Sequence, residues 1–165
     1  MPAVSDTSPI LGLAVIGHLE LLRRQFGNIF IPQAVLSELK VGADFRGVSV
    51  IQQAIKDGWL EAREIQNIPL AQSLSLELDR GESEAITLAM DWGVGIIAMD
   101  ERIGRERARI MGLKTIGVLG VLLNAKKHGE IKSLKNAMAA LRNKIGFFIS
   151  DELYRQILIQ AGETE

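Results

Sequence analysis

The sequence contains no cysteine, no long apolar run and few aromatic residues. The absence of cysteine excludes a disulfide framework and any thiolate zinc site. No apolar run approaches the roughly 18–20 residues that a membrane-spanning helix needs. The first six residues lack the basic and apolar blocks of a signal peptide, so we expect a cytoplasmic protein that does not contact a membrane.

Aromatic and histidine side chains are scarce, which limits the ways in which the protein could bind nucleic acid bases or catalyse proton transfer. Aromatic residues make up 5% of the chain and form no cluster in the sequence, so recognition of bases by stacking is not expected. The two histidines, His18 and His128, are predicted on a helix surface and at a helix end. The sequence therefore favours a mechanism that needs no histidine base.

The chain is long and apolar enough to form a packed core. It has 165 residues, of which 47% are hydrophobic and 24% charged, and we expect residues 1–165 to form a single domain. The net charge of −1 hides an asymmetry, because residues 1–100 carry 7 Lys/Arg against 13 Asp/Glu and residues 101–145 carry 11 against 3. Such a split indicates either a basic surface for a polyanion or two differently charged solvated faces.

Short β-branched runs alternate with longer amphipathic stretches, which predicts βαβ units and an α/β fold. We expect a three-layer α/β/α arrangement around a central parallel sheet of four to five strands. The predicted strands cover residues 3–6, 29–31, 60–65, 95–100 and 115–118. The predicted helices cover residues 9–26, with a break near Gly17, and 33–40, 48–58, 79–92, 102–111, 119–128, 133–144 and 150–162.

Two of the predicted helices begin with residues that are typical of N-terminal caps. Ser8 followed by Pro9 is typical of an N-cap with proline at the first helical position. Asp79 and Glu82 have the spacing of a capping box.

Asp6 and Asp100 each end a predicted strand and precede a predicted helix. In an open parallel sheet, functional sites lie beyond the carboxyl ends of the strands, where the strand order reverses. A single aspartate at such a place is commonly a helix cap or a turn residue. Two at equivalent ends of neighbouring strands would lie in one cleft, which indicates a pair of carboxylates with a shared role.

Further carboxylates lie on two of the predicted helices. Glu38 shares a helix face with Ala34 and Val35, so it is either a buried acid that needs a partner or a solvated residue at the helix end. No cap explains Glu84, whereas the capping box accounts for Glu82. Carboxylates that converge repel one another unless cations are present, and an oxygen-rich set suits one or two Mg²⁺ or Mn²⁺ ions. Such ions support in-line phosphoryl displacement by water.

In order and spacing, these segments resemble a PIN domain over nearly the whole chain. The residues that carry the resemblance are Asp6-Thr7-Ser8, Glu38, the run Gly81-Glu82-Ser83-Glu84-Ala85 and the apolar strand that ends in Asp100. The toxin-like, VapC-type branch of predicted nucleic-acid-binding PIN proteins is the most similar, through Ser5-Asp6-Thr7-Ser8-Pro9, Ile31-Pro32, Val35-Leu36-Ser37-Glu38-Leu39 and the stretch from Gly120 to Lys127.

The resemblance implies a metal-dependent endoribonuclease that hydrolyses phosphodiester bonds of RNA, acting as the toxin of a toxin–antitoxin pair. It also implies a homodimer and a small antitoxin protein as a partner. Carried over to this sequence, the catalytic and metal-binding residues are Asp6, Glu38, Glu84 and Asp100, with Ser8, Glu82 and Glu101 as further candidates near the metal. Many family members have another acid shortly after the residue that matches Asp100, and here Glu101 alone stands in that place.

The resemblance also gives the basic half of the chain a role in RNA binding. Arg102, Arg105 and Arg109 are spaced at i, i+3 and i+7 on one predicted helical face, and Lys126 and Lys127 follow later. These side chains would contact phosphates, which carry little sequence information. The predicted helix over residues 150–162 is apolar on one side and packs either on the domain or on a partner.

Other functions fit parts of the sequence. A PIN-fold module could bind RNA or a protein partner without cutting it. Only one acid, Glu101, follows Asp100 closely, which is compatible with this alternative. A haloacid-dehalogenase-type phosphatase needs Asp-x-Asp after the first strand, and Asp6-Thr7-Ser8 lacks the second aspartate. A dinucleotide-binding domain needs the motif Gly-x-Gly-x-x-Gly at the same place, and the sequence does not contain it there. The sequence therefore favours a metal-dependent ribonuclease.

Overall fold

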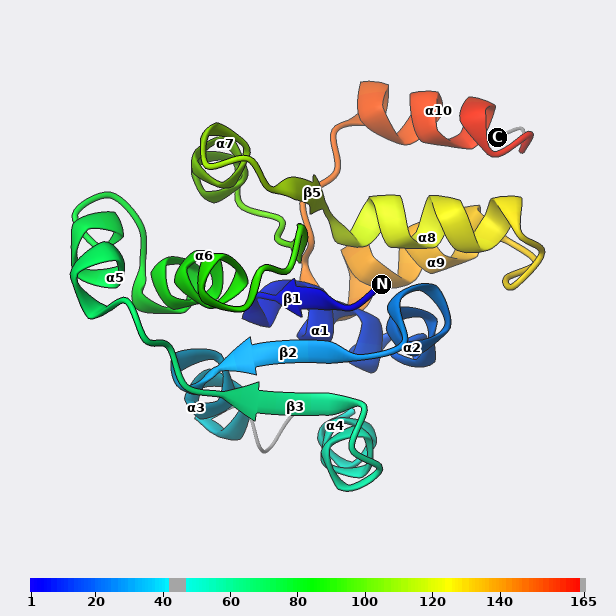
Figure 1. Ribbon diagram of the computed structural model, residues 1–165. Coiled ribbons are helices and arrows are strands. Elements are labelled where there is room, and N and C mark those ends of the chain that lie inside the picture. Colours follow the sequence, from blue (N-terminus) through cyan, green and yellow to red (C-terminus); the bar gives the residue numbers. More distant parts are fainter. Residues whose placement is uncertain (42–46, 164–165) are drawn as a thin grey trace.

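A computed structural model of the protein describes residues 1–41 and 47–163, which form a five-stranded sheet (Figure 1). The strands are β1 (Ala3–Ser5), β2 (Ile29–Pro32), β3 (Leu60–Arg63), β4 (Ile96–Ala98) and β5 (Lys114–Ile116). Their order across the sheet is β3-β2-β1-β4-β5, and each neighbouring pair is parallel. The prediction of an α/β fold with a parallel sheet of four to five strands is confirmed.

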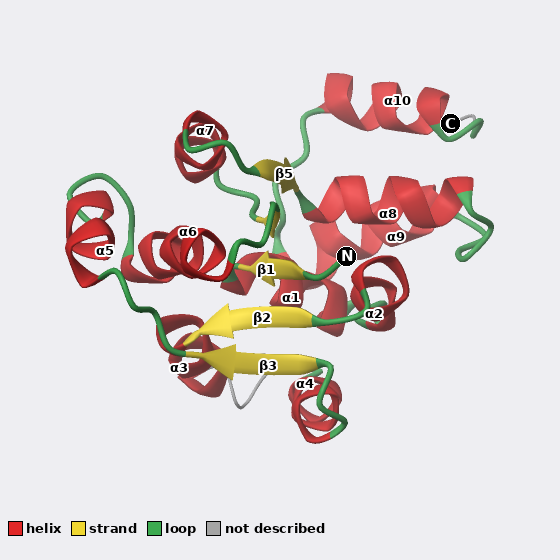
Figure 2. Ribbon diagram, in the orientation of Figure 1, coloured by secondary structure: helices red, strands yellow, loops and turns green. Residues whose placement is uncertain are grey.

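Helices cover both faces of the sheet, as Figure 2 shows. One helical layer packs on the sheet face that carries Ala3, Ile29 and Ile31. It comprises α1 (Thr7–Val15), α2 (Glu20–Phe26), α3 (Gln33–Val41), α4 (Val48–Lys56), α8 (Val118–Lys127), α9 (Leu134–Ile145) and α10 (Asp151–Gln160). The opposite layer comprises α5 (Ile68–Leu74), α6 (Arg80–Trp92) and α7 (Arg102–Ile110), which pack against Val4 and Phe30.

The pleat of the strands explains why their sequences are continuously apolar. In β2, Ile29 and Ile31 enter one core while Phe30, between them, enters the other. Both faces of the sheet are therefore covered, and no position of β2 is free to be polar. The same argument applies to β4, where Ile97 and Ala98 are both fully buried.

The predicted break near Gly17 in the helix over residues 9–26 is confirmed, because α1 and α2 form there and Gly17 takes a φ of 80° between them. One observed helix was not predicted. No helix is predicted over residues 68–74, yet α5 forms there and is capped by the Asn67 side chain, which accepts a hydrogen bond from the Leu70 N–H at 3.1 Å. Within α5 the buried residues are Ala71 and Leu74, which is too short an apolar pattern to reveal a helical period.

The start of α1 corrects the capping prediction for Ser8. The helix begins at Thr7 with Asp6 at the N-cap position, so Ser8 lies inside the first turn and is not the cap. Pro9 remains in that turn, where its missing N–H costs nothing. The capping box at α6 is confirmed, because the Glu82 N–H donates to Asp79 Oδ1 at 2.8 Å and the Asp79 N–H donates to Glu82 Oε1 at 3.4 Å.

The C-terminal helix α10 packs on the body of the same chain. Ile157 and Leu158 are buried in the core shared with α8 and α9. Beyond the helix, the Glu163 carboxylate accepts the Leu134 N–H at 2.7 Å and lies 3.6 Å from Lys126 Nζ. In the described ranges, no helix combines the length and the apolar character needed to cross a bilayer.

Candidate active site

An open pocket of about 750 Å³ lies beyond the carboxyl ends of β1 and β4. The chain runs from β1 outward through β2 to β3 and then returns to β4 on the other side of β1, so the strand order reverses between β1 and β4. Carboxylates from four separate segments line this pocket. They are Asp6, Glu38, Asp79, Glu82, Asp100 and Glu101.

Asp6 lies at the floor of the pocket, where β1 passes into α1. Its backbone N–H donates to the Ala98 carbonyl at 2.9 Å, which fixes the end of β1 against β4. The side chain is only 8% exposed. Burial, with the negative charges of Asp79, Glu38 and Asp100, raises the pKa of Asp6 to about 7, although a backbone hydrogen bond from Thr7 opposes the shift. Asp6 is thus a buried carboxylate without a cationic partner among the described residues, and a bound metal ion would stabilise its charged form.

Asp100 is held between the starts of two helices. Its Oδ1 accepts the Val118 N–H at 2.7 Å, from the first residue of α8, and its Oδ2 accepts the Ser8 hydroxyl at 3.0 Å. Burial raises the pKa of Asp100, although these hydrogen bonds and the charge of Arg105 oppose the shift. Ser8 therefore orients an acid of the pocket, which accounts for a serine at this position better than the predicted cap does.

Glu38 reaches the pocket from α3, and its residue as a whole is exposed. Its Oε2 accepts the hydroxyl of Thr7 at 2.5 Å. Thr7 and Ser8 thus each hold one carboxylate of the pocket, and both come from the first turn of α1. Of the two alternatives that the sequence left open, Glu38 is the solvated one, held by a hydroxyl, and its negative charge remains available to a cation.

Glu82 lines the pocket although the sequence explains it as a capping residue. It is 7% exposed, and its Oε2 is a buried atom without a hydrogen-bond partner among the described residues. Burial, with the charges of Asp79 and Asp6, raises the pKa of Glu82 to about 8. A buried oxygen without a donor is costly unless a ligand supplies one.

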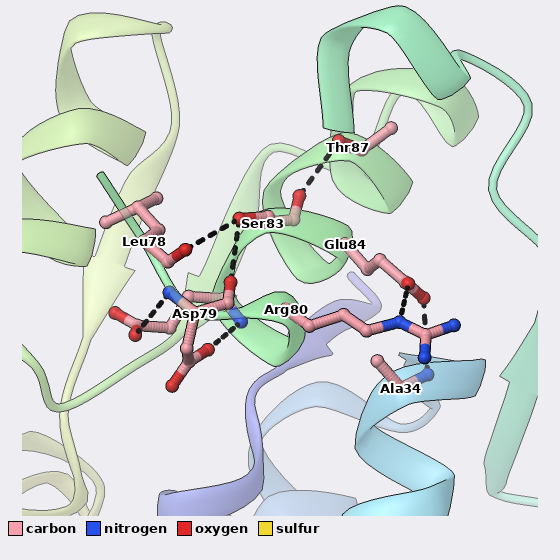
Figure 3. Close-up of polar contacts among 8 residues, drawn as sticks. Ala34, Leu78, Asp79, Arg80, Ser83, Glu84 and Thr87 are labelled. Carbon is pink, nitrogen blue, oxygen red and sulfur yellow. Dashed lines mark hydrogen bonds and ion pairs between the residues drawn. The ribbon is translucent and has the colours of Figure 1, made fainter. Parts of the chain in front are cut away.

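Glu84 lies outside the pocket lining, on another face of α6. Its Oε1 accepts the Ala34 N–H at 3.2 Å and its Oε2 accepts Arg80 Nε at 2.8 Å, as Figure 3 shows. The carboxylate therefore caps the start of α3 and ties it to α6. The structure does not bring Glu84 together with Asp6, Glu38 and Asp100, and places Glu82 with them instead.

Glycines leave room for the acids of the pocket. A Cβ on Gly81 would lie 2.6 Å from Glu38 Oε1 and 3.2 Å from Asp6 Oδ1. A Cβ on Gly104 would lie 2.5 Å from Glu82 Oε2, and one on Gly117 would lie 2.9 Å from Asp100 Oδ1. Three glycines from different segments therefore border carboxylate oxygens closely enough to exclude any larger residue without a shift.

We expect Gly81→Ala to weaken metal binding without destabilising the fold. The added methyl group displaces the Glu38 carboxylate, which sits at the end of a flexible side chain, while alanine favours the helix by up to about 1 kcal/mol. The expected loss of Mn²⁺ affinity is about 10-fold. Calorimetric titration with Mn²⁺ and thermal unfolding measure the two effects. Gly95→Ala is the matched control, because a Cβ there meets no atom within 4 Å. Unchanged affinity in Gly81→Ala would contradict the role of Glu38.

The predicted basic residues divide into two groups. Arg105 borders Asp100, and Arg102 and Arg109 lie on the same helix, α7, where they contact Glu106 and Thr115. Lys126 and Lys127 lie in the last turn of α8, at the opposite end from Val118 and Asp100. The structure therefore brings Arg105 beside Asp100 and does not bring the two lysines there.

Among residues 1–41 and 47–163, no three carboxylate or imidazole groups are close enough together to hold a cation as they stand. The donor set of the pocket nevertheless fits a hard dication, because it consists of carboxylate and hydroxyl oxygens. Burial is the main cause of the raised pKa values of both Asp6 and Glu82, and the neighbouring negative charges add to it. Sequence reasoning missed Asp79 as a pocket residue, because its capping role explained it fully.

Comparison with known proteins agrees with this geometry. A family model described as a PIN domain matches residues 2–163. The chain belongs to the PIN-domain family. PIN domains are generally nucleases and typically use divalent metal ions, so the acidic pocket lies on a nuclease-type fold. No curated protein matches the sequence of this PIN domain.

Proposed function

We propose that the protein is a metal-dependent endoribonuclease that hydrolyses phosphodiester bonds of RNA. The observation that carries this proposal is the convergence of Asp6, Glu38, Glu82 and Asp100, from four separate segments, on one pocket where the strand order reverses. These four residues would hold one or two Mg²⁺ or Mn²⁺ ions, with Glu101 at the rim as a further ligand. The bound metal would supply a nucleophilic water at neutral pH and stabilise the attacking and leaving oxygens at the phosphate.

The residues of the chain set the geometry for this reaction. Thr7 and Ser8 hold Glu38 and Asp100 through their hydroxyl groups, so two of the four acids are oriented before any ion arrives. Arg105 lies beside Asp100 and provides a cation for a phosphate next to the one that is cut. Since α7 carries Arg102 and Arg109 as well, the RNA backbone would follow this helix away from the pocket.

Cleavage of single-stranded RNA by wild type and Asp100→Asn tests the proposal. We expect the wild type to cut with Mn²⁺ or Mg²⁺ and to stop when EDTA is added. The asparagine side chain in this variant can still accept the Val118 N–H, so the variant should fold, and its rate should fall by about 10²–10³-fold. Failure of the wild type to cut RNA with either ion would overturn the proposal, and binding of RNA without cleavage would support the binding module instead. Cleavage at the wild-type rate by Asp100→Asn would identify a contaminant.

We further propose that this cytoplasmic nuclease acts as a toxin, as a homodimer that a small antitoxin protein restrains. The similarity of its motifs to the VapC-type branch supports this role. Induced expression in a host cell should arrest growth, and expression of Asp100→Asn should not. Equal growth of both strains, with the wild-type protein present and active in cell extract, would contradict the toxin role and leave the nuclease intact.

A further inference from the structure

A second pocket adjoins the acidic one and shares a wall with it. It encloses about 410 Å³, and Asp100, Phe147 and Phe148 line both pockets. The two phenylalanines belong to the segment between α9 and α10, which passes β5 on its way to α10 (Figure 1). A group bound in the second pocket would therefore lie directly beside the acids.

Phe148 is held in place by its neighbours and yet packs against little of the protein. Its side chain is 87% exposed, while the next residue, Ile149, is 4% exposed and anchored in the core. The Arg142 guanidinium donates to the Ile149 carbonyl, and Ser150 caps α10 by accepting the Leu153 N–H at 3.2 Å. The segment is thus fixed on the side of α10, so the exposure of the Phe148 ring is a property of the fold.

The second pocket combines the groups that a nucleotide needs. Its apolar lining includes Leu119, Leu153 and Ile157, next to the Phe148 ring, and Arg105 supplies a positive charge at the end nearest Asp100. A planar, weakly polar base stacks on an aromatic ring and an apolar wall, whereas a phosphate needs a cation. The volume lies within the range of about 300–1,000 Å³ that is typical of small-ligand sites.

We propose that this pocket is a nucleotide subsite, in which the base next to the cleaved phosphodiester stacks on Phe148 and its phosphate contacts Arg105. The inference rests on the proposed function for the position of the cleaved bond. It adds a base-binding position to that function, and a base must leave its duplex partner to enter the pocket. The subsite therefore favours single-stranded over double-stranded nucleic acid, and it assigns base stacking to one of the scarce aromatic residues.

Binding of a single-stranded RNA oligonucleotide with one 2-aminopurine tests the subsite without cleavage. Measured with Mg²⁺ in an Asp6→Asn background, stacking should quench the fluorescence of the base analogue on binding. Adding Phe148→Ala should weaken the Kd by about 10-fold and abolish the quenching, whereas Phe148→Trp should retain both. Ile159→Ala, which removes a side chain from another exposed position of 75%, is the control and should change neither.

Several results would overturn the subsite. The first is an unchanged Kd and unchanged quenching in Phe148→Ala. The second is equal binding of the matching duplex. The third is a loss of self-association in Phe148→Ala with RNA binding intact, which would assign the ring to a protein interface. The proposed function fails by a different result, since it depends on cleavage by the wild type, which this binding experiment does not measure.

Discussion

Glu82→Gln is expected to lower RNA cleavage by at least about 10²-fold, whereas Glu84→Gln should leave the rate within about 3-fold of wild type. Glu82 lines the acidic pocket and has a buried oxygen without a partner among the described residues. Glu84 is committed to Arg80 and to the Ala34 N–H, away from the pocket. Removing the charge of Glu82 therefore removes a metal ligand, while removing that of Glu84 weakens a contact between two helices.

The two substitutions form a matched pair, because they make the same change two residues apart on one helix. Glutamine at position 82 can still complete the capping box with Asp79, so loss of the α6 start would not explain a loss of cleavage. Rates on the same RNA with saturating Mn²⁺, together with the melting temperature of each variant, separate catalysis from folding. Loss of cleavage in Glu84→Gln with Glu82→Gln active would restore the assignment that the family resemblance implies.

The choice between Glu82 and Glu84 shows where sequence reasoning reaches its limit. Asp6 and Asp100 could be predicted as pocket residues, because each follows an apolar strand and the carboxyl ends of parallel strands share one edge. Two glutamates in the first turns of one helix point in different directions, and their surroundings depend on how α6 rotates against α3 and the sheet. The capping box was a sufficient local explanation of Glu82, so its second role was hidden.

The fold itself was largely predictable, for a related reason. Strands buried on both faces leave continuous apolar runs such as residues 29–31, which stand out in one dimension. The segment that forms α5 has only two buried positions and no continuous apolar run, so its sequence did not indicate a helix. The exposure of Phe148 beside the pocket could not be predicted either, because the composition gives the number of aromatic residues and not which of them are exposed. Features that depend on packing between distant segments could not be predicted from the pattern alone.

The metal-free protein is expected to lose stability as the pH rises from 5 to 8, and Asp6→Asn should remove much of that loss. The pKa of Asp6 is raised from its ordinary 3.8 to about 7 in the fold, so the protonated acid favours the folded state and its contribution disappears as the carboxyl ionises. Glu82, with a pKa of about 8, acts in the same direction. At pH 8 in EDTA, Asp6→Asn should exceed the wild type by about 2–4 kcal/mol, or roughly 5–10 °C in melting temperature.

Addition of Mn²⁺ at pH 8 should reverse this order. A dication that binds the folded state raises the melting temperature by mass action, and the wild type offers it one more carboxylate than Asp6→Asn does. Thermal unfolding at pH 5 and pH 8, each in EDTA and in Mn²⁺, measures the four states. A wild type whose metal-free stability rises over this range in parallel with Asp6→Asn would contradict a buried, ionising Asp6. An equal rise in melting temperature of both proteins with Mn²⁺ would show that Asp6 is not a metal ligand. A cation at this pocket relieves the repulsion between carboxylates, and that repulsion depends on the charge of Asp6.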